Sequence, residues 1–76
     1  MGVLLLIPKL GVAMTAGTLV EWLVADGDQV SAGEAIYVLE TEKAETEVSA
    51  PISGVVRIEA DPGESYPVGT CIGEIA

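Results

Sequence analysis

The feature that most constrains the fold is an internal repeat, in which the second half of the chain resembles the first at a distance of 36 residues. The matched pairs are Gly27 with Gly63, Gly33 with Gly69, Ile36 with Ile72, Asp28 with Glu64 and Val20 with Val56. In each half, an expected strand is followed by an acidic glycine turn, a short strand, a second turn with glycine and an apolar strand. A repeat of this kind suggests two similar β-units that pack face to face around a pseudo-two-fold axis.

Nine glycines and four prolines interrupt the chain at short intervals, and no long helical periodicity is present. The apolar and β-branched runs between them predict strands. We expect these strands at residues 3–7, 18–24, 29–30, 35–40, 44–50, 55–59 and 71–75. Neither unit alone could bury its apolar face, so the two must close into a flattened all-β sandwich or barrel.

Several side chains are expected in the core of this sandwich. Strict alternation along residues 18–24 places Leu19 on one face and Trp22 on the other. We interpret Trp22 as a core aromatic residue, and Cys71 as a small core residue with no redox role. Residues 3–7 form the first buried strand, which Pro8 ends.

The turns carry two further expectations. Gly27 and Gly63 each precede an acid in a polar turn, so a positive φ is expected at one or both. The segment from Gly54 to Gly63 is one residue shorter than the segment from Gly17 to Gly27, which predicts a tighter turn in the second half. The repeat also predicts where the ends of the molecule lie. The hairpin expected between the two halves, around residues 40–48, should lie at one end of the molecule, and the two chain ends should lie near the other.

Composition narrows the function. The 76 residues suffice for one small domain, residues 1–76. The chain has no histidine and a single cysteine, which excludes an internal disulfide and argues against a zinc site or an independent catalytic triad. The net charge of −9 argues against nucleic acid and anionic membranes and favours basic partners. The longest apolar run is too short to span a bilayer.

Residues 40–48 hold one lysine, Lys43, amid the four carboxylates of Glu40, Glu42, Glu45 and Glu47. Strand-like runs lie on both sides of the lysine, and downstream of it Ala44, Thr46, Val48 and Ala50 follow the period of a half-buried strand. Two strands so close in sequence predict a hairpin with Glu42 and Lys43 at its tip. Without Asn-Gly or Asp-Gly, an open type I turn is favoured over type I′. Lys43 is then exposed to water, either as an ordinary solvated lysine or as a functional group.

The motif Glu40-Thr41-Glu42-Lys43-Ala44 resembles the Glu-Thr-Asp-Lys-Ala signature of lipoyl domains, in the biotinyl/lipoyl attachment family. Glu42 replaces the commoner Asp, which keeps the charge and lengthens the side chain. The resemblance covers nearly the whole chain. Further similar segments are Pro8-Lys9-Leu10-Gly11, Gly17-Thr18-Leu19-Val20-Glu21-Trp22, Gly27-Asp28, Gly33-Glu34, Ala50-Pro51 and Ser53-Gly54-Val55-Val56.

This resemblance implies two four-stranded antiparallel sheets and lipoic acid in amide linkage to Lys43, flanked by Glu42 and Ala44. It implies a carrier that swings acyl groups and reducing equivalents between the active sites of a 2-oxo acid or acetoin dehydrogenase complex. The domain alone would catalyse nothing and would belong to a dihydrolipoamide acyltransferase. The implied partners are a lipoate ligase or lipoyl transferase, a 2-oxo acid decarboxylase, the acyltransferase catalytic domain and dihydrolipoamide dehydrogenase. The compartment would be the cytoplasm of a bacterium or the mitochondrial matrix of a eukaryote.

Three alternatives share this resemblance. A biotin carrier domain has the same fold, but its lysine typically lies between two methionines, whereas Met1 and Met14 lie far from Lys43 in this sequence. The glycine-cleavage carrier also bears lipoate, but it is longer and has extra helical segments. An unmodified structural module of the same fold is the third. The sequence leaves open which acyl group travels, and whether the carrier is free-standing or part of a longer acyltransferase.

Overall fold

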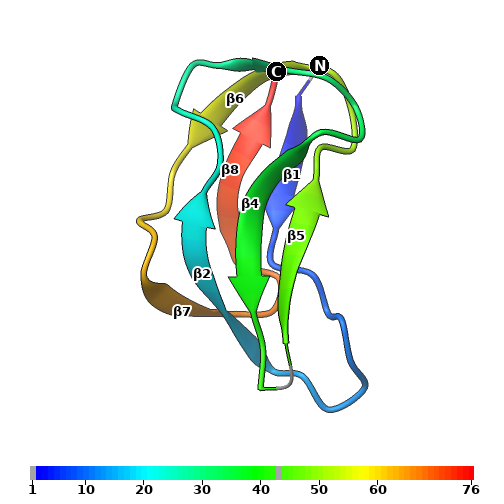
Figure 1. Ribbon diagram of the computed structural model, residues 1–76, viewed down its shortest axis with the longest axis vertical. Coiled ribbons are helices and arrows are strands. Elements are labelled where there is room, and N and C mark those ends of the chain that lie inside the picture. Colours follow the sequence, from blue (N-terminus) through cyan, green and yellow to red (C-terminus); the bar gives the residue numbers. More distant parts are fainter. Residues whose placement is uncertain (1, 43) are drawn as a thin grey trace.

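Eight short strands form two antiparallel sheets that pack face to face in this computed structural model, which describes residues 2–42 and 44–76 (Figure 1). The strands are β1 (Val3–Leu6), β2 (Ala16–Trp22), β3 (Gln29–Val30), β4 (Ala35–Glu40), β5 (Glu45–Ser49), β6 (Gly54–Ile58), β7 (Glu64–Pro67) and β8 (Cys71–Ile75). Their order is β1-β8-β6-β3 in one sheet and β5-β4-β2-β7 in the other. The predicted all-β sandwich of two four-stranded sheets is confirmed.

The predicted pseudo-two-fold symmetry is also confirmed. Exchanging β1 with β5, β2 with β6, β3 with β7 and β4 with β8 converts one sheet order into the other. Individual hydrogen bonds follow the same exchange. The Gly27 N–H donates to the Val56 carbonyl at 2.8 Å, and the Gly63 N–H donates to the Leu19 carbonyl at 2.6 Å. The two turn glycines have φ angles of 90° and 89°. The repeated sequence therefore builds the same turn twice, once between β2 and β3 and once between β6 and β7.

The one-residue difference between the halves lies in a strand, so the expectation of a tighter turn is wrong. The register of β2 against β4 shifts between Leu19 and Glu21, whereas β6 pairs with β8 without a shift. The extra residue of the first half is thus accommodated as a β-bulge at Val20, which lets β2 keep its pairing with β4. As a result, the structural counterpart of Val56 is Leu19, whereas the 36-residue offset matched Val56 with Val20. The side chains of Leu19 and Val56 are both 0% exposed.

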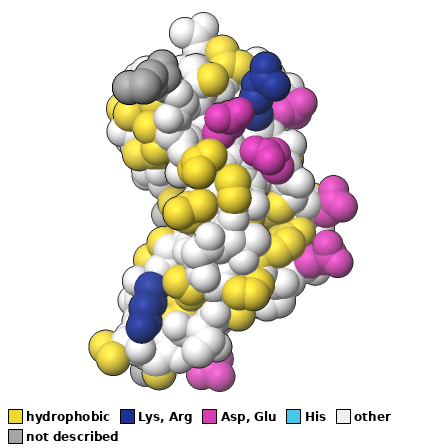
Figure 2. Space-filling view, turned by 180° about the vertical axis from the view of Figure 1, so that it is seen from behind, with side chains coloured by type: hydrophobic (Ala, Val, Ile, Leu, Met, Phe, Trp, Pro, Cys, Tyr) yellow, Lys and Arg dark blue, Asp and Glu magenta, His cyan; other side chains and the backbone are white. Residues whose placement is uncertain are grey.

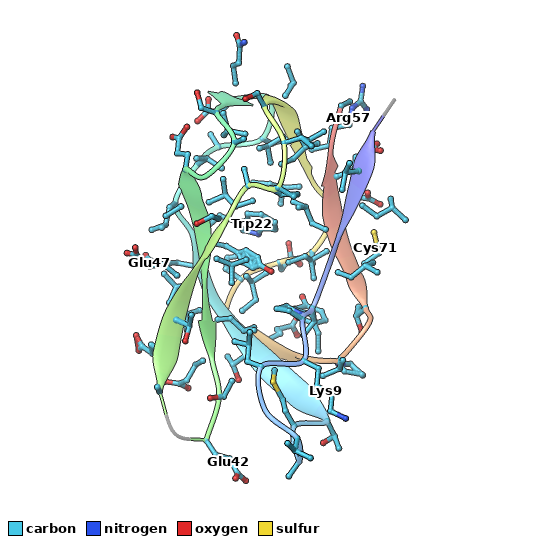
Figure 3. The ribbon with its side chains drawn as sticks, turned by 90° about the vertical axis from the view of Figure 1, so that its right-hand side faces the viewer. Lys9, Trp22, Glu42, Glu47, Arg57 and Cys71 are labelled. Atoms are coloured by element: carbon cyan, nitrogen blue, oxygen red, sulfur yellow. The ribbon has the colours of Figure 1, made fainter. Side chains whose placement is uncertain are left out.

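The bulge also explains how Trp22 reaches the core. Strict alternation would put Leu19 and Trp22 on opposite faces, but the extra residue brings both to the core side. The Trp22 ring packs edge-on against Tyr37 with 5.4 Å between ring centroids, and its Nε1–H donates to the Ala60 carbonyl at 3.1 Å. Figure 3 shows Trp22 between the two sheets. Trp22 is partly buried and packs against the core, as its interpretation as a core aromatic residue predicted. Burial raises the pKa of its partner Tyr37 to about 12.

Two burial expectations at the other sheet need correction. Leu5 of β1 and Ile7, just after it, are buried as expected, but Leu4 and Leu6 are 58% and 46% exposed. Cys71 pairs with Leu6 in the neighbouring strand and is exposed as well. Because successive side chains of a strand point to opposite faces, an apolar run does not by itself make both faces buried. Hydrophobic side chains accordingly gather on the back of the molecule, as Figure 2 shows.

The turn at Gly27 offers a test of the fold. Gly27→Val should lower the free energy of unfolding by about 1–3 kcal/mol, because a β-branched residue is strained at a φ of 90°. A Cβ at this position would meet no atom within 4 Å, so the effect isolates the backbone strain. Gly11→Val is the matched control, since Gly11 also has open space but no positive φ. Urea unfolding of both variants measures the difference, and equal midpoints would contradict the assigned strain.

Candidate functional site: the tip of the β4–β5 hairpin

The predicted hairpin around the acidic stretch is present. β4 pairs with β5 in antiparallel register up to Glu40 opposite Glu45. Beyond this pair, the Thr41 N–H donates to the Ala44 carbonyl at 2.9 Å, and the Thr41 hydroxyl donates to the same oxygen at 3.3 Å. The chain therefore reverses between Thr41 and Ala44. Lys43 itself lies outside the described residues, as do its predicted exposure and the predicted turn type.

The hairpin ends at one end of the molecule, beside the loop between β1 and β2 (Figures 1 and 3). Val48 is half-buried, but Thr46 and Ala44 are exposed, so the expected half-buried pattern holds only for the inner part of β5. Residues 44–47 are all exposed, whereas Thr41 is half-buried and lines a groove with residues 10–16. Glu42 is exposed and, in Figure 3, points away from the molecule. The two sequence neighbours of Lys43 are thus both open to solvent.

Carboxylates surround this tip. Glu40 and Glu45 are exposed and lie directly opposite each other across the two strands, and Glu42 and Glu47 are exposed beside them. Like charges in directly opposed positions destabilise a strand pair. A surface that tolerates this cost is suited to a basic partner. The charges also protect β5, an edge strand, from pairing with another sheet. The two roles are compatible.

A groove that the sequence did not reveal lies beside the tip. It has a volume of about 540 Å³, and its walls are residues 10–16 on one side and Thr41, Glu42, Ala44 and Thr46 on the other. Two apolar side chains of the first wall remain exposed, Leu10 at 49% and Val12 at 97%. Leu10 and Val12 follow Pro8 in a segment that the sequence predicts to be a loop, and apolar residues in a loop could have indicated a binding surface. Their proximity to the hairpin depends on the tertiary fold.

Met14 holds the wall of residues 10–16 in place. Its N–H donates to the Gly11 carbonyl at 3.1 Å, and its sulfur accepts a hydrogen bond from the Leu10 N–H at 3.2 Å. The side chain packs on the edge of the core beside Leu39. Gly17 makes room for this contact, because a Cβ there would lie 3.0 Å from the Met14 methyl and 2.9 Å from a Leu39 methyl. The groove wall is therefore anchored to the sandwich.

Across residues 2–42 and 44–76, no group of three or more His, Cys, Asp or Glu side chains is placed to hold a metal ion. In the same part of the chain, no helix has the length and apolar character needed to cross a membrane. The hairpin and its groove remain the candidate site.

The chain is similar to known proteins over almost its whole length. The model of a biotin/lipoyl family, described as biotin-requiring enzyme, matches residues 4–75. The chain is 39% identical over 93% of its length to the dihydrolipoyllysine-residue acetyltransferase component of the acetoin cleaving system of Pseudomonas putida. It is 42% identical over 93% of its length to the corresponding component of the pyruvate dehydrogenase complex of Mycobacterium bovis. It is 38% identical over 99% of its length to the dihydrolipoyllysine-residue succinyltransferase component of the 2-oxoglutarate dehydrogenase complex of Rickettsia felis. The chain spans 20%, 12% and 19% of these relatives, respectively.

Proposed function

The chain belongs to the biotin/lipoyl attachment family, and from this we propose that residues 1–76 are a single lipoyl carrier domain with lipoic acid in amide linkage to Lys43. The observation that carries the proposal is the place of this lysine in the chain. It lies between Glu42 and Ala44, in the reversal that the Thr41–Ala44 hydrogen bond closes. The sandwich holds the two sequence neighbours of Lys43, Glu42 and Ala44, at the tip of the β4–β5 hairpin.

The described residues fit such a group. Glu42 and Ala44 are exposed, so a chain attached between them has a free path into solvent. When bound, the dithiolane supplies the acyl-carrying and redox chemistry. The protein residues hold the attachment point, and the tether raises the local concentration of the carried group at each active site. The four carboxylates around the tip complement a basic surface on an enzyme that docks there.

The proposed partners are supported by the names of the relatives, which describe acyltransferase components of an acetoin cleaving system and of two dehydrogenase complexes. We propose that this domain is part of such an acyltransferase and catalyses nothing alone. Its partners are then a lipoate ligase or lipoyl transferase, a 2-oxo acid decarboxylase, the acyltransferase catalytic domain and dihydrolipoamide dehydrogenase. The relatives are named as acetyltransferase and succinyltransferase components, so the proposal names the class of acyl carrier and no single acyl group. The proposed compartment is the bacterial cytoplasm or the mitochondrial matrix.

Biotin is the alternative modification within the same family. The neighbours of Lys43 are Glu42 and Ala44, in place of the methionines typical of biotin carriers, and Met14 is committed to the wall of the groove. The relatives described above are all named for dihydrolipoyllysine. Both observations favour lipoate.

Modification of the chain should occur on Lys43 alone. The other lysine, Lys9, is exposed near the same end of the molecule but lies outside the hairpin (Figure 3). We expect a lipoate ligase to add one lipoyl group to the parent and to Lys9→Arg, and none to Lys43→Arg. Intact mass measures each product and distinguishes lipoate from biotin. A lipoylated Lys43→Arg variant, or an unmodified parent, would refute the proposed attachment.

A further inference from the structure

We propose that the groove between residues 10–16 and the hairpin tip is a resting site for the dithiolane end of the lipoyl arm. This inference rests on the proposed attachment to Lys43. It adds a binding site on the domain itself for a group whose chemistry takes place on other proteins. The arm would then alternate between a docked position on its own domain and an extended position that reaches an enzyme.

The position of the groove is the first argument. Glu42 and Ala44, the residues on either side of the attachment lysine, both line it. A flexible chain rooted between them starts at the rim of the groove and can fold back into it. The volume of about 540 Å³ is in the range of small-ligand pockets, about 300–1,000 Å³. The only occupant held permanently within reach by a covalent bond is the arm.

The lining is the second argument. Leu10, Val12 and Met14 form an apolar wall, and Val12 at 97% exposure has almost no contact with the rest of the domain. Contact with a dithiolane would remove such surface from water. The Met14 sulfur is soft and polarisable, as are the two sulfurs of the ring, and such groups adapt well to each other's shape. The carboxylate of Glu42 lies at the rim, where it stays in water.

Weak contacts are sufficient because the ligand is tethered. A short flexible link gives an effective concentration on the order of millimolar, so even a site of low intrinsic affinity is occupied for part of the time. Weak docking also suits a carrier, since the arm must leave the groove to reach each enzyme. The expected behaviour is rapid exchange between the two positions, with the ring partly shielded from solvent.

Two measurements on the intact lipoylated domain test this proposal. Backbone amide chemical shifts, compared before and after lipoylation, should change in residues 10–16 as well as in the hairpin. The dithiolane should be reduced by a water-soluble phosphine about threefold faster in Val12→Ser than in the parent, because the variant removes apolar contact. Leu4→Ser is the matched control, since Leu4 is 58% exposed on the outer face of the other sheet. Its reduction rate should equal that of the parent.

The outcomes separate this inference from the proposed function. Intact mass first establishes whether Lys43 carries lipoate, and a negative result there overturns both. If the lysine is lipoylated but shifts are confined to residues 40–46, and Val12→Ser leaves the reduction rate unchanged, only the resting site is refuted. The chemical-shift comparison needs no variant and therefore does not depend on how a substitution folds.

Discussion

Exchanging the side chains of Glu42 and Lys43 should nearly abolish lipoylation. The double variant Glu42→Lys with Lys43→Glu keeps composition and net charge but moves the lysine one residue along the hairpin. Because the chain reverses between Thr41 and Ala44, such a step moves the root of the lysine side chain by one Cα–Cα spacing, about 3.8 Å, and changes its direction. Misplacement by about 1 Å can already cost about a hundredfold in rate at an active site. We therefore expect a loss of at least about a hundredfold in the rate of modification.

Glu42→Ala is the control for charge. It removes one of four exposed carboxylates and leaves the lysine in place, so we expect the rate to fall by less than about threefold. Incubation of both variants and the parent with a lipoate ligase, followed by intact mass over time, gives the comparison. Comparable rates for the parent and the exchanged variant would mean that the ligase reads local charge and ignores the position of the lysine.

Gly54→Val should cause a large loss of stability. A Cβ at Gly54 would lie 2.5 Å from the Ala76 carbonyl oxygen and 2.8 Å from Ile75 Cγ2. The backbone cannot move aside freely there, because Val55 and Ala76 exchange two hydrogen bonds at 2.8 and 2.9 Å. Overpacking of this kind typically costs about 1–3 kcal/mol, and we expect about 3 kcal/mol because the nearest atom belongs to the backbone.

The control is again Gly11→Val, where a new side chain meets no atom within 4 Å. Urea unfolding followed by Trp22 fluorescence should show a markedly lower midpoint for Gly54→Val and little change for Gly11→Val. Gly54→Ala should fall between the parent and the valine variant, since it adds only the clashing Cβ. Unchanged midpoints across the Gly54 series would contradict the prediction, because they would mean that β6 and the chain end after β8 can move apart at little cost.

The sequence predicted those features that local chemistry determines. The turns at Gly27 and Gly63 were predicted because glycine tolerates positive φ, and both have it. The hairpin was predicted from two strand-like runs with a short polar connection, and its strands pair as expected. The repeat predicted the symmetry of the two sheets, because equal turns at equal spacing build equal units.

The features that were missed depend on a partner strand or on distant segments. The bulge at Val20 exists only relative to β4, so alternation within β2 gave the wrong face for Leu19 relative to Trp22. Exposure of Cys71 depends on which face of β8 meets the opposite sheet. The groove requires residues 10–16 to meet the hairpin, about 30 positions later in the chain, a contact that no short pattern records.

The pairing of β1 with β8 brings the two chain ends together at the end of the domain opposite the hairpin tip. Val3 lies opposite Ile75, and both chain ends are at the top of the long axis in Figure 1, with the hairpin tip at the bottom. The longest dimension of the described structure is 32 Å. A polypeptide continuing from either end would therefore join the domain at the end opposite the hairpin tip, to which the proposed attachment residue, Lys43, belongs in the sequence. Rotation of the domain about such a connection would move the hairpin tip through a radius of up to the 32 Å length of the domain, in addition to the reach of the proposed lipoyl arm.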